Sequence, residues 1–117
     1  MEYLLLIYQN DADLAKMSDA QKGALHQEYD AFTQSIETSK HLRGGNALQP
    51  PTTATTVRLR NGKRVVTDGP FAETKEQLAG YYLIEAKDLD EATKIAARIP
   101  SARTGTIEVR PIHVFTR

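Results

Sequence analysis

The sequence contains no cysteine, and its 15 basic side chains are balanced by 15 acidic ones. Without cysteine the chain forms no disulfide, no thiolate nucleophile, no iron–sulfur cluster and no cysteine zinc site. A formal net charge of zero disfavours nucleic acid and anionic membranes as partners, because both attract clustered Lys and Arg. We therefore expect no nucleic-acid partner.

Long hydrophobic runs are also missing. The longest, residues 3–8, is far too short to cross a bilayer, and Glu2 stands where a signal peptide carries positive charge. The length of 117 residues fits one domain with its own core. We expect a single domain over residues 1–117, a cytoplasmic location and no membrane partner.

The first half of the chain predicts a strand followed by a helix. Residues 3–8 are apolar at every position, which predicts a strand covered on both faces. Residues 10–16 are polar and are expected to form a loop. Ser18 and Gln21 have the spacing of a capping box. Apolar residues then recur at helical spacing, namely Leu25, Tyr29, Phe32 and Ile36.

The middle of the chain predicts a hairpin after an irregular stretch. Residues 42–55 are predicted to form a loop that can include one short strand. Asn61-Gly62 is a strong two-residue hairpin turn, and it joins residues 56–60 to residues 63–67. We expect the exposed face of this hairpin to carry Arg58, Arg60 and Arg64.

The last part of the chain predicts a strand, a helix and a final strand. Residues 80–86 form the strand, Asp88 caps the helix and Pro100 ends it. The buried stripe of this helix is expected to be Leu89, Ala92, Ala96 and Ile99. Residues 106–115 form the last strand, with Ile107, Val109, Pro111, His113 and Phe115 on one face.

These elements predict an α+β domain with an antiparallel sheet and two helices on one face. Because residues 3–8 are apolar on both faces, the second face of the sheet needs a cover, and the chain has no third predicted helix. The simplest cover is another copy of the chain, so we expect a homodimer.

Asp68-Gly69-Pro70 follows an apolar strand and turns sharply. Asp68 can accept hydrogen bonds from the following backbone, Gly69 permits positive φ, and Pro70 fixes its own φ. Such a turn either serves only to reverse the chain or holds the Asp68 carboxylate rigidly at a functional site.

The same stretch carries a family resemblance. Asp68-Gly69-Pro70-Phe71 with its flanks closely resembles the DGPF branch of the YCII-related proteins, and the resemblance spans nearly the whole chain. The matching segments are residues 3–8, 44–45, 48–50, 68–78, 80–82, 88–92 and 108–111. The resemblance implies a ferredoxin-like subunit that pairs into a dimeric α+β barrel. It also implies a signalling role as an alternative, since similar proteins are often encoded beside extracytoplasmic-function sigma factors.

Three residues are candidates for acid–base chemistry, namely Asp68, Glu28 and His26. YCII proteins of the namesake type resemble enzymes with a His on the first helix, and that position falls nearest Glu28, with His26 two residues away. Two carboxylates in one pocket would raise the pKa of one of them and leave a usable acid or base. The alternative is that Glu28 is a solvated helix residue and Asp68 a turn cap.

Phe71, Tyr81 and Tyr82 are the candidate substrate-binding residues. Tyr81 and Tyr82 face opposite sides of one strand, so one hydroxyl can lie in the pocket. The three histidines lack metal-site spacing and no phosphate loop is present, so we expect no metal and no cofactor. His113 is expected to be a core or interface residue. Two functions stay open: a small-molecule pocket at the Asp68–Phe71 loop with cofactor-independent chemistry, or a non-catalytic binding module.

Overall fold

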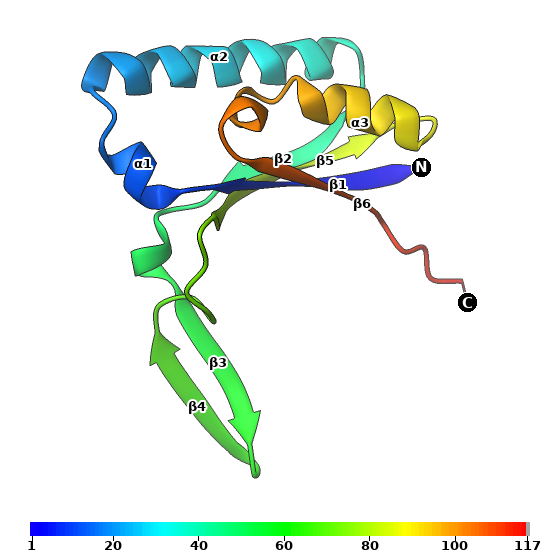
Figure 1. Cartoon of the computed structure of the whole chain (residues 1–117). Helices are drawn as coiled ribbons and strands as arrows, with labels where there is room; N and C mark the ends of the chain where they lie inside the picture. Colours follow the sequence, from blue (N-terminus) through cyan, green and yellow to red (C-terminus); the bar gives the residue numbers. More distant parts are fainter. Residues whose placement is uncertain (117) are drawn as a thin grey trace.

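A four-stranded antiparallel sheet with two long helices on one face forms the body of the protein (Figure 1). The computed structural model describes residues 1–116. The strands are β1 (Glu2–Gln9), β2 (Leu42–Ala47), β5 (Gln77–Glu85) and β6 (Thr106–Pro111), in the spatial order β2-β5-β1-β6. The covering helices are α2 (Asp19–Thr38) and α3 (Leu89–Ala97). This βαββαβ order confirms the predicted α+β, ferredoxin-like fold.

The core lies between the sheet and these two helices. Along β1 the odd-numbered residues Tyr3, Leu5 and Ile7 are buried on the helix side. Pairing with β5 and β6 places Ile84 and Val109 on the same side. The helices contribute Phe32 and Ile36 from α2 and Ala92, Ile95 and Ala96 from α3. The other face of the sheet, called the open face, carries Leu4, Leu6, Tyr8, Tyr81 and Leu83.

Helix α2 begins as its sequence predicts, and it ends just before a residue in the left-handed conformation. The Ser18 hydroxyl accepts from the backbone NH of Gln21, and the Gln21 side chain accepts from the backbone NH of Ser18. At the other end Lys40 has a φ of 65°, and the backbone NH of His41 donates to the Ile36 carbonyl over 2.9 Å. Lys40 therefore occupies the left-handed position where helices usually place glycine.

The prediction of a loop over residues 10–16 was wrong. Residues 11–15 form the short helix α1 (Asp11–Ala15), because the Asn10 side chain caps it by accepting from the backbone NH of Asp13 at 3.0 Å. The Asn10 amide also donates to the Lys75 carbonyl, which fixes the helix beside the start of β5. The capping role of Asn10 was missed because the segment was interpreted as polar, although Leu14 and two alanines lie within it.

Two further expectations need correction. Leu89 is 54% exposed, and Ile95 takes its place in the buried stripe of α3. The last strand ends at Pro111, so His113 and Phe115 lie beyond it, exposed, with their rings 4.5 Å apart. Residues 42–55 contain the short strand that the prediction allowed, the edge strand β2, and in addition the short 3-10 helix η1 (Pro51–Thr53).

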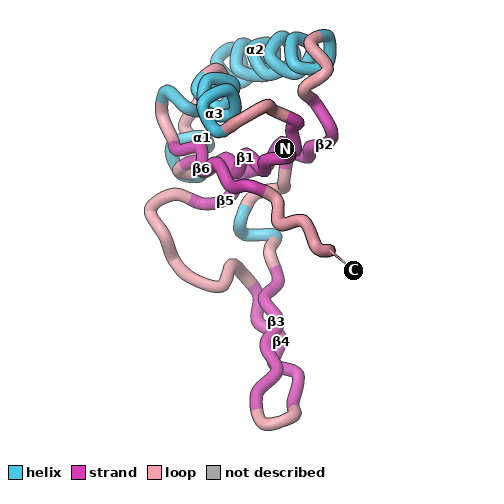
Figure 2. Tube along the Cα trace, turned by 90° about the vertical axis from the view of Figure 1, so that its right-hand side faces the viewer, coloured by secondary structure: helices cyan, strands magenta, loops and turns pink. Residues whose placement is uncertain are grey.

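A two-stranded hairpin, called the arm, extends from the body on the side away from the helices (Figures 1 and 2). It consists of β3 (Thr55–Arg60) and β4 (Lys63–Asp68). Asn61 and Gly62 have φ of 52° and 74°, which confirms the predicted turn with two positive φ values. Register places Arg64 opposite Leu59, on the other face from Arg58, so the predicted grouping of Arg64 with Arg58 and Arg60 was wrong.

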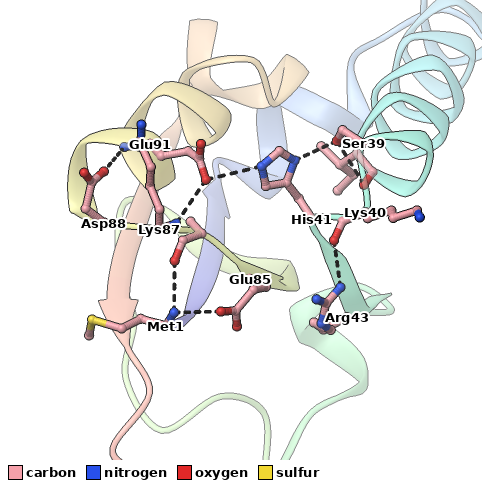
Figure 3. A network of polar contacts seen from close by, with 11 residues as sticks. Met1, Ser39, Lys40, His41, Arg43, Glu85, Lys87, Asp88 and Glu91 are labelled. Carbon is pink, nitrogen blue, oxygen red and sulfur yellow. Dashed lines mark hydrogen bonds and ion pairs between the residues drawn. The ribbon is translucent and has the colours of Figure 1, made fainter.

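A polar network ties the first residue to the junction between the helices (Figure 3). The amino terminus donates to the Glu85 carboxylate at 2.7 Å, and this hydrogen bond holds the pKa of Glu85 below its usual value. His41 lies between Ser39 and Glu91, at 2.6 and 3.3 Å.

After α3 the chain makes the 3-10 turn η2 (Pro100–Arg103) and enters β6. Among residues 1–116 no helix is both long and apolar enough to cross a membrane.

Candidate functional site

A cleft of about 580 Å³ opens between α2 and the β2–β5–β1 part of the sheet. Its walls come from β1, the α1 region, α2, β2 and β5, and we call it the α2 cleft. The lining residues used below are Gln9, His26, Tyr29, Asp30, Thr33, Tyr81 and Tyr82. Most of the remaining wall is apolar, including Ile7, Leu14, Met17, Leu25 and Leu48. A cavity of this size with few polar groups is typical of small-molecule sites.

Tyr82 places its hydroxyl at the foot of α2. Its ring packs edge-on against Phe32 at 5.3 Å, and its hydroxyl lies 2.6 Å from that of Thr33. Burial raises the pKa of the Tyr82 phenol above its usual value, and the Thr33 hydrogen bond opposes the shift. Tyr82 therefore stays a neutral hydrogen-bonding group at physiological pH.

Tyr29 forms a second polar group in the cleft. Its hydroxyl lies 2.5 Å from that of Ser101, which is 3% exposed, and both accept hydrogen bonds from the Gln9 amide. Burial is also the main cause that raises the pKa of Tyr29. The neutral phenols of Tyr29 and Tyr82 thus lie in one cleft, fixed by separate partners.

His26 and Asp30 stand on α2 where it borders the cleft. They are one helical turn apart, and the Nε2 of His26 lies 3.5 Å from the Asp30 carboxylate. Both side chains are exposed, at 78% and 70%. A histidine beside a carboxylate can accept and return a proton near neutral pH. His26 is thus the predicted site residue that shares the cleft with Tyr82.

Glu28 lies on a different flank of α2. Its carboxylate accepts from Arg103 at 2.6 Å, and it lines a neighbouring cavity of about 470 Å³ with Ser101 and Arg103. The two side chains are 44% and 63% exposed. Glu28 therefore forms an ion pair with Arg103 on the η2 side and does not line the α2 cleft.

Asp68 and Phe71 lie at the base of the arm. Asp68 ends β4 opposite Thr55, is exposed, and precedes Gly69, whose φ of 98° agrees with the predicted turn. Phe71 is 77% exposed. Neither residue lines the α2 cleft or the two neighbouring cavities in the described part of the chain. Figure 1 shows α2 on one side of the sheet and the arm on the other, so one chain does not bring Asp68 to His26 or Glu28.

Tyr81 and Tyr82 face opposite sides of β5, as predicted. Tyr81 pairs with Leu6 and Asn46 across the ladders and accepts from the Asn46 amide at 2.8 Å. Tyr81 also borders the α2 cleft, but its hydroxyl is held by Asn46 on the opposite side of β5, and the hydroxyl that joins α2 is that of Tyr82. The sequence had left open which of the two lies in the pocket.

Several residues of the cleft were missed from the sequence. Tyr29 was assigned to the apolar stripe of its helix, which hid the role of its hydroxyl. Gln9, Thr33 and Ser101 lie far apart in the chain, and no spacing rule joins them. Asp30 could have been found, because it stands four residues after His26 on one helix. Among residues 1–116 no three His, Asp or Glu side chains cluster as metal ligands do.

Comparison with known proteins identifies relatives along the entire domain. The model of the YCII-related domain matches residues 1–116. An uncharacterised protein of Rhizobium meliloti (strain 1021) is 36% identical over 117 residues, which cover 98% of this chain and 94% of that protein. These matches agree with the ferredoxin-like topology described above. The chain belongs to the YCII-related family.

Proposed function

We propose that this chain acts as a homodimer and binds a small organic molecule in the α2 cleft, where His26 and Asp30 perform cofactor-independent acid–base chemistry. The observation that carries the proposal is the combination of cleft volume with fixed, neutral phenols. About 580 Å³ accommodates a metabolite-sized molecule, and the wall is mainly apolar. The branch with the Asp-Gly-Pro-Phe motif is the part of the family to which we assign it.

The polar groups indicate what the ligand carries. Tyr82 and Tyr29 are each held by a hydroxyl partner, and the Gln9 amide donates to both Tyr29 and Ser101, which fixes the Tyr29 hydroxyl in the cleft. Neutral donors of this kind suit carbonyl, amide or hydroxyl groups. The apolar residues Met17 and Leu25 suit a hydrocarbon part of the same ligand.

His26 is the proposed proton acceptor. It borders the cleft, and the Asp30 carboxylate lies 3.5 Å from its Nε2. A proton taken from the ligand at His26 can be returned to another atom of the same ligand. This chemistry requires no group beyond the chain's own side chains.

The pairing of Asp68 with Glu28 stays a prediction. Because α2 and the arm lie on opposite sides of the sheet, Asp68 would have to come from the second copy of a dimer. NMR titration of the carboxylates in wild type and Asp68→Asn tests it. Identical titration of Glu28 in both proteins would remove Asp68 from the site and leave it as a turn residue.

A non-catalytic binding module is the second candidate, with sigma-factor signalling as its setting. It is favoured by exposed apolar residues on the arm, where Val57 and Leu59 are 61% and 68% exposed. Such side chains suit a protein surface rather than a reaction. Binding of a small molecule without turnover would favour this candidate.

The cleft is tested by ligand binding to two neighbouring tyrosine variants. A thermal-shift screen of small carbonyl and amide metabolites supplies the ligand, because bound ligand stabilises the native state. Tyr82→Phe should weaken binding by about tenfold, the effect of one hydrogen bond, and Tyr81→Phe should not. If Tyr81→Phe weakens binding and Tyr82→Phe does not, the ligand lies on the open face and the proposal is wrong.

The acid–base role is tested with His26→Gln. We expect this variant to bind the ligand as wild type does and to lose turnover, because the exposed side chain contributes little to the wall. Glu37→Gln is the control on the same helix and should keep turnover, because Glu37 is exposed and lines none of the three cavities described for residues 1–116. Equal turnover in wild type and His26→Gln would exclude His26 as the proton acceptor.

A further inference from the structure

The arm has one apolar face that nothing in its own chain covers. Register puts Val57 opposite Val66 and Leu59 opposite Arg64, so Val57, Leu59 and Val66 share a face. They are 61%, 68% and 54% exposed. A two-stranded hairpin alone in water is marginally stable, so an arm of this kind calls for a surface to pack on.

The arm extends away from the rest of the chain. The radius of gyration is 16.3 Å, whereas a compact chain of this length has roughly 13 Å. Both views show the arm projecting beyond the sheet on the side opposite the helices (Figures 1 and 2). It leaves the sheet at the β2–β5 edge, because it connects these two strands. Any body that covers the open face must therefore lie beside the arm.

The open face presents a surface of matching character. Leu4, Leu6 and Leu83 are half-buried there, with no helix of the same chain above them. Glu2, Glu85 and Glu108 share this face by register. The apolar centre is therefore bordered by carboxylates, two of which are paired, Glu85 with the amino terminus and Glu108 with Arg110.

The arm and the rest of the chain differ in net charge. Residues 55–68 hold four basic side chains and one acidic one, so in a chain of zero net charge the remainder is net negative. A second copy therefore offers the arm an apolar surface, and Arg64, which shares the face of Leu59 and Val66, can meet the carboxylates that border this surface. Opposite potentials of this kind favour association and fix its orientation.

We propose that the arm docks through Val57, Leu59 and Val66 on the open face of a second copy of this chain, so that each subunit of the dimer is held by the other's arm. The inference rests on the homodimer proposed above and adds the segment that forms its contact. In a two-fold dimer the contact occurs twice, because each arm meets the other body.

Adjacent valines of β4 provide a matched test. Val66 lies on the apolar face, whereas Val65 lies opposite Arg58 on the basic face. Val66→Lys should raise the dimer dissociation constant by about a hundredfold, since each lost valine contact gives roughly tenfold and the change occurs twice. Val65→Lys should leave the dimer dissociation constant within about threefold of the wild-type value, because substitutions at exposed positions have small effects. Sedimentation velocity over a dilution series measures both, and circular dichroism verifies that both variants are folded.

The absence of cysteine permits a second measurement that does not depend on affinity. At concentrations where the dimer forms, Val66→Cys should react with a maleimide about tenfold more slowly than Val65→Cys. This ratio corresponds to the free energy of burying one such side chain. Dilution to monomer should make the two rates equal.

The outcomes separate the two proposals. If wild type stays a monomer at micromolar concentration, both the homodimer and the docked arm are wrong. If wild type is a dimer and both Val66 variants behave as their Val65 counterparts, the homodimer stands and the docked arm is wrong. If the arm instead binds a 20-base-pair DNA duplex and Arg58→Gln abolishes that binding, nucleic acid is its partner and the inference is overturned.

Discussion

The body and the arm are both built from antiparallel strands, yet they bury their residues very differently. In β1 the helix-side residues Tyr3, Leu5 and Ile7 are at most 4% exposed. In β4 all six residues are exposed, including the adjacent Val65 and Val66. The strands of the body are covered by α2 and α3, whereas the arm has no helix of its own above either face.

The difference shows which forces hold each part together. The body depends on side chains that are distant in sequence, as where Leu5 of β1 packs with Ile36 of α2 in one core. The arm depends on its turn and on its base, where the backbone NH of Gly69 donates to the Ala54 carbonyl and the Thr56 hydroxyl donates to the Gly69 carbonyl. We therefore expect the arm to open locally while the body unfolds as one unit.

The largest expected contrast compares two leucines. Leu5→Ala should lower the free energy of unfolding by about 2–5 kcal/mol, because Leu5 is 0% exposed and its loss leaves a cavity. Leu59→Ala should lower it by less than about 0.5 kcal/mol when the protein is diluted to monomer, because Leu59 is 68% exposed. Urea unfolding followed by circular dichroism measures both. Similar losses in the two variants would show that the arm packs within its own chain.

Two glycines of the body give the next contrast. A Cβ on Gly105 would lie 2.1 Å from the Tyr8 carbonyl oxygen, so Gly105→Ala should destabilise the body by about 1–3 kcal/mol. A Cβ on Gly23 meets nothing within 4 Å, and Gly23→Ala in α2 should stabilise by about 0.5–1 kcal/mol. Thermal unfolding of both variants measures the two changes in stability. A tolerated Gly105→Ala would mean that η2 and β1 can separate without cost.

The fold was predictable where the relevant information was local or periodic. The Ser18 and Gln21 capping box, the Asn61-Gly62 turn and the apolar run that forms β1 each depend on a few neighbouring residues. Asn10 and Leu89 were assigned wrongly for a different reason. A single polar cap decided the first, and periodicity does not show it. Leu89 is the first residue of α3, and Ile95, which stands three residues after Ala92, could have been found from the helical spacing.

The site was predictable only in part. His26, Tyr81 and Tyr82 were named from the sequence, and all three line the α2 cleft. The contacts of Tyr82 with Thr33 and of Tyr29 with Ser101 join residues 49 and 72 positions apart. Such pairs exist only after α2 has packed on the sheet. Asp68 was chosen because its turn is rigid, but a rigid turn does not determine which surface it faces.

The alkaline limit of stability tests the body without the arm, since all five tyrosines lie outside residues 55–68. The folded state raises the pKa of Tyr29 and Tyr82 by burial, so their contribution is complete below about pH 10 and is lost as pH rises through the folded values. Tyr82→Phe should cost about 0.5–1.5 kcal/mol at neutral pH and flatten the alkaline decline. Chemical unfolding from pH 7 to 12 measures both effects, with Thr33→Val as a variant that should raise the Tyr82 pKa further. A decline as steep in Tyr82→Phe as in wild type would assign it to other groups.

The smallest expected effect compares two positive-φ residues, Lys40 at the end of α2 and Asn61 in the arm. Lys40→Gly relieves about 1–2 kcal/mol of left-handed strain and adds about 0.5–1 kcal/mol of chain entropy cost, so we expect a net gain of about 0.5 kcal/mol. This gain should raise the melting temperature by about 2 °C. Asn61→Gly should leave it unchanged, because asparagine tolerates this conformation and because the arm opens before the body melts. Scanning calorimetry on diluted protein resolves such shifts, and amide exchange at Arg60 and Lys63 reports the arm separately. A melting temperature that moves with Asn61→Gly as much as with Lys40→Gly would show that the arm and the body unfold together, and the distinction between them would then hold for burial alone.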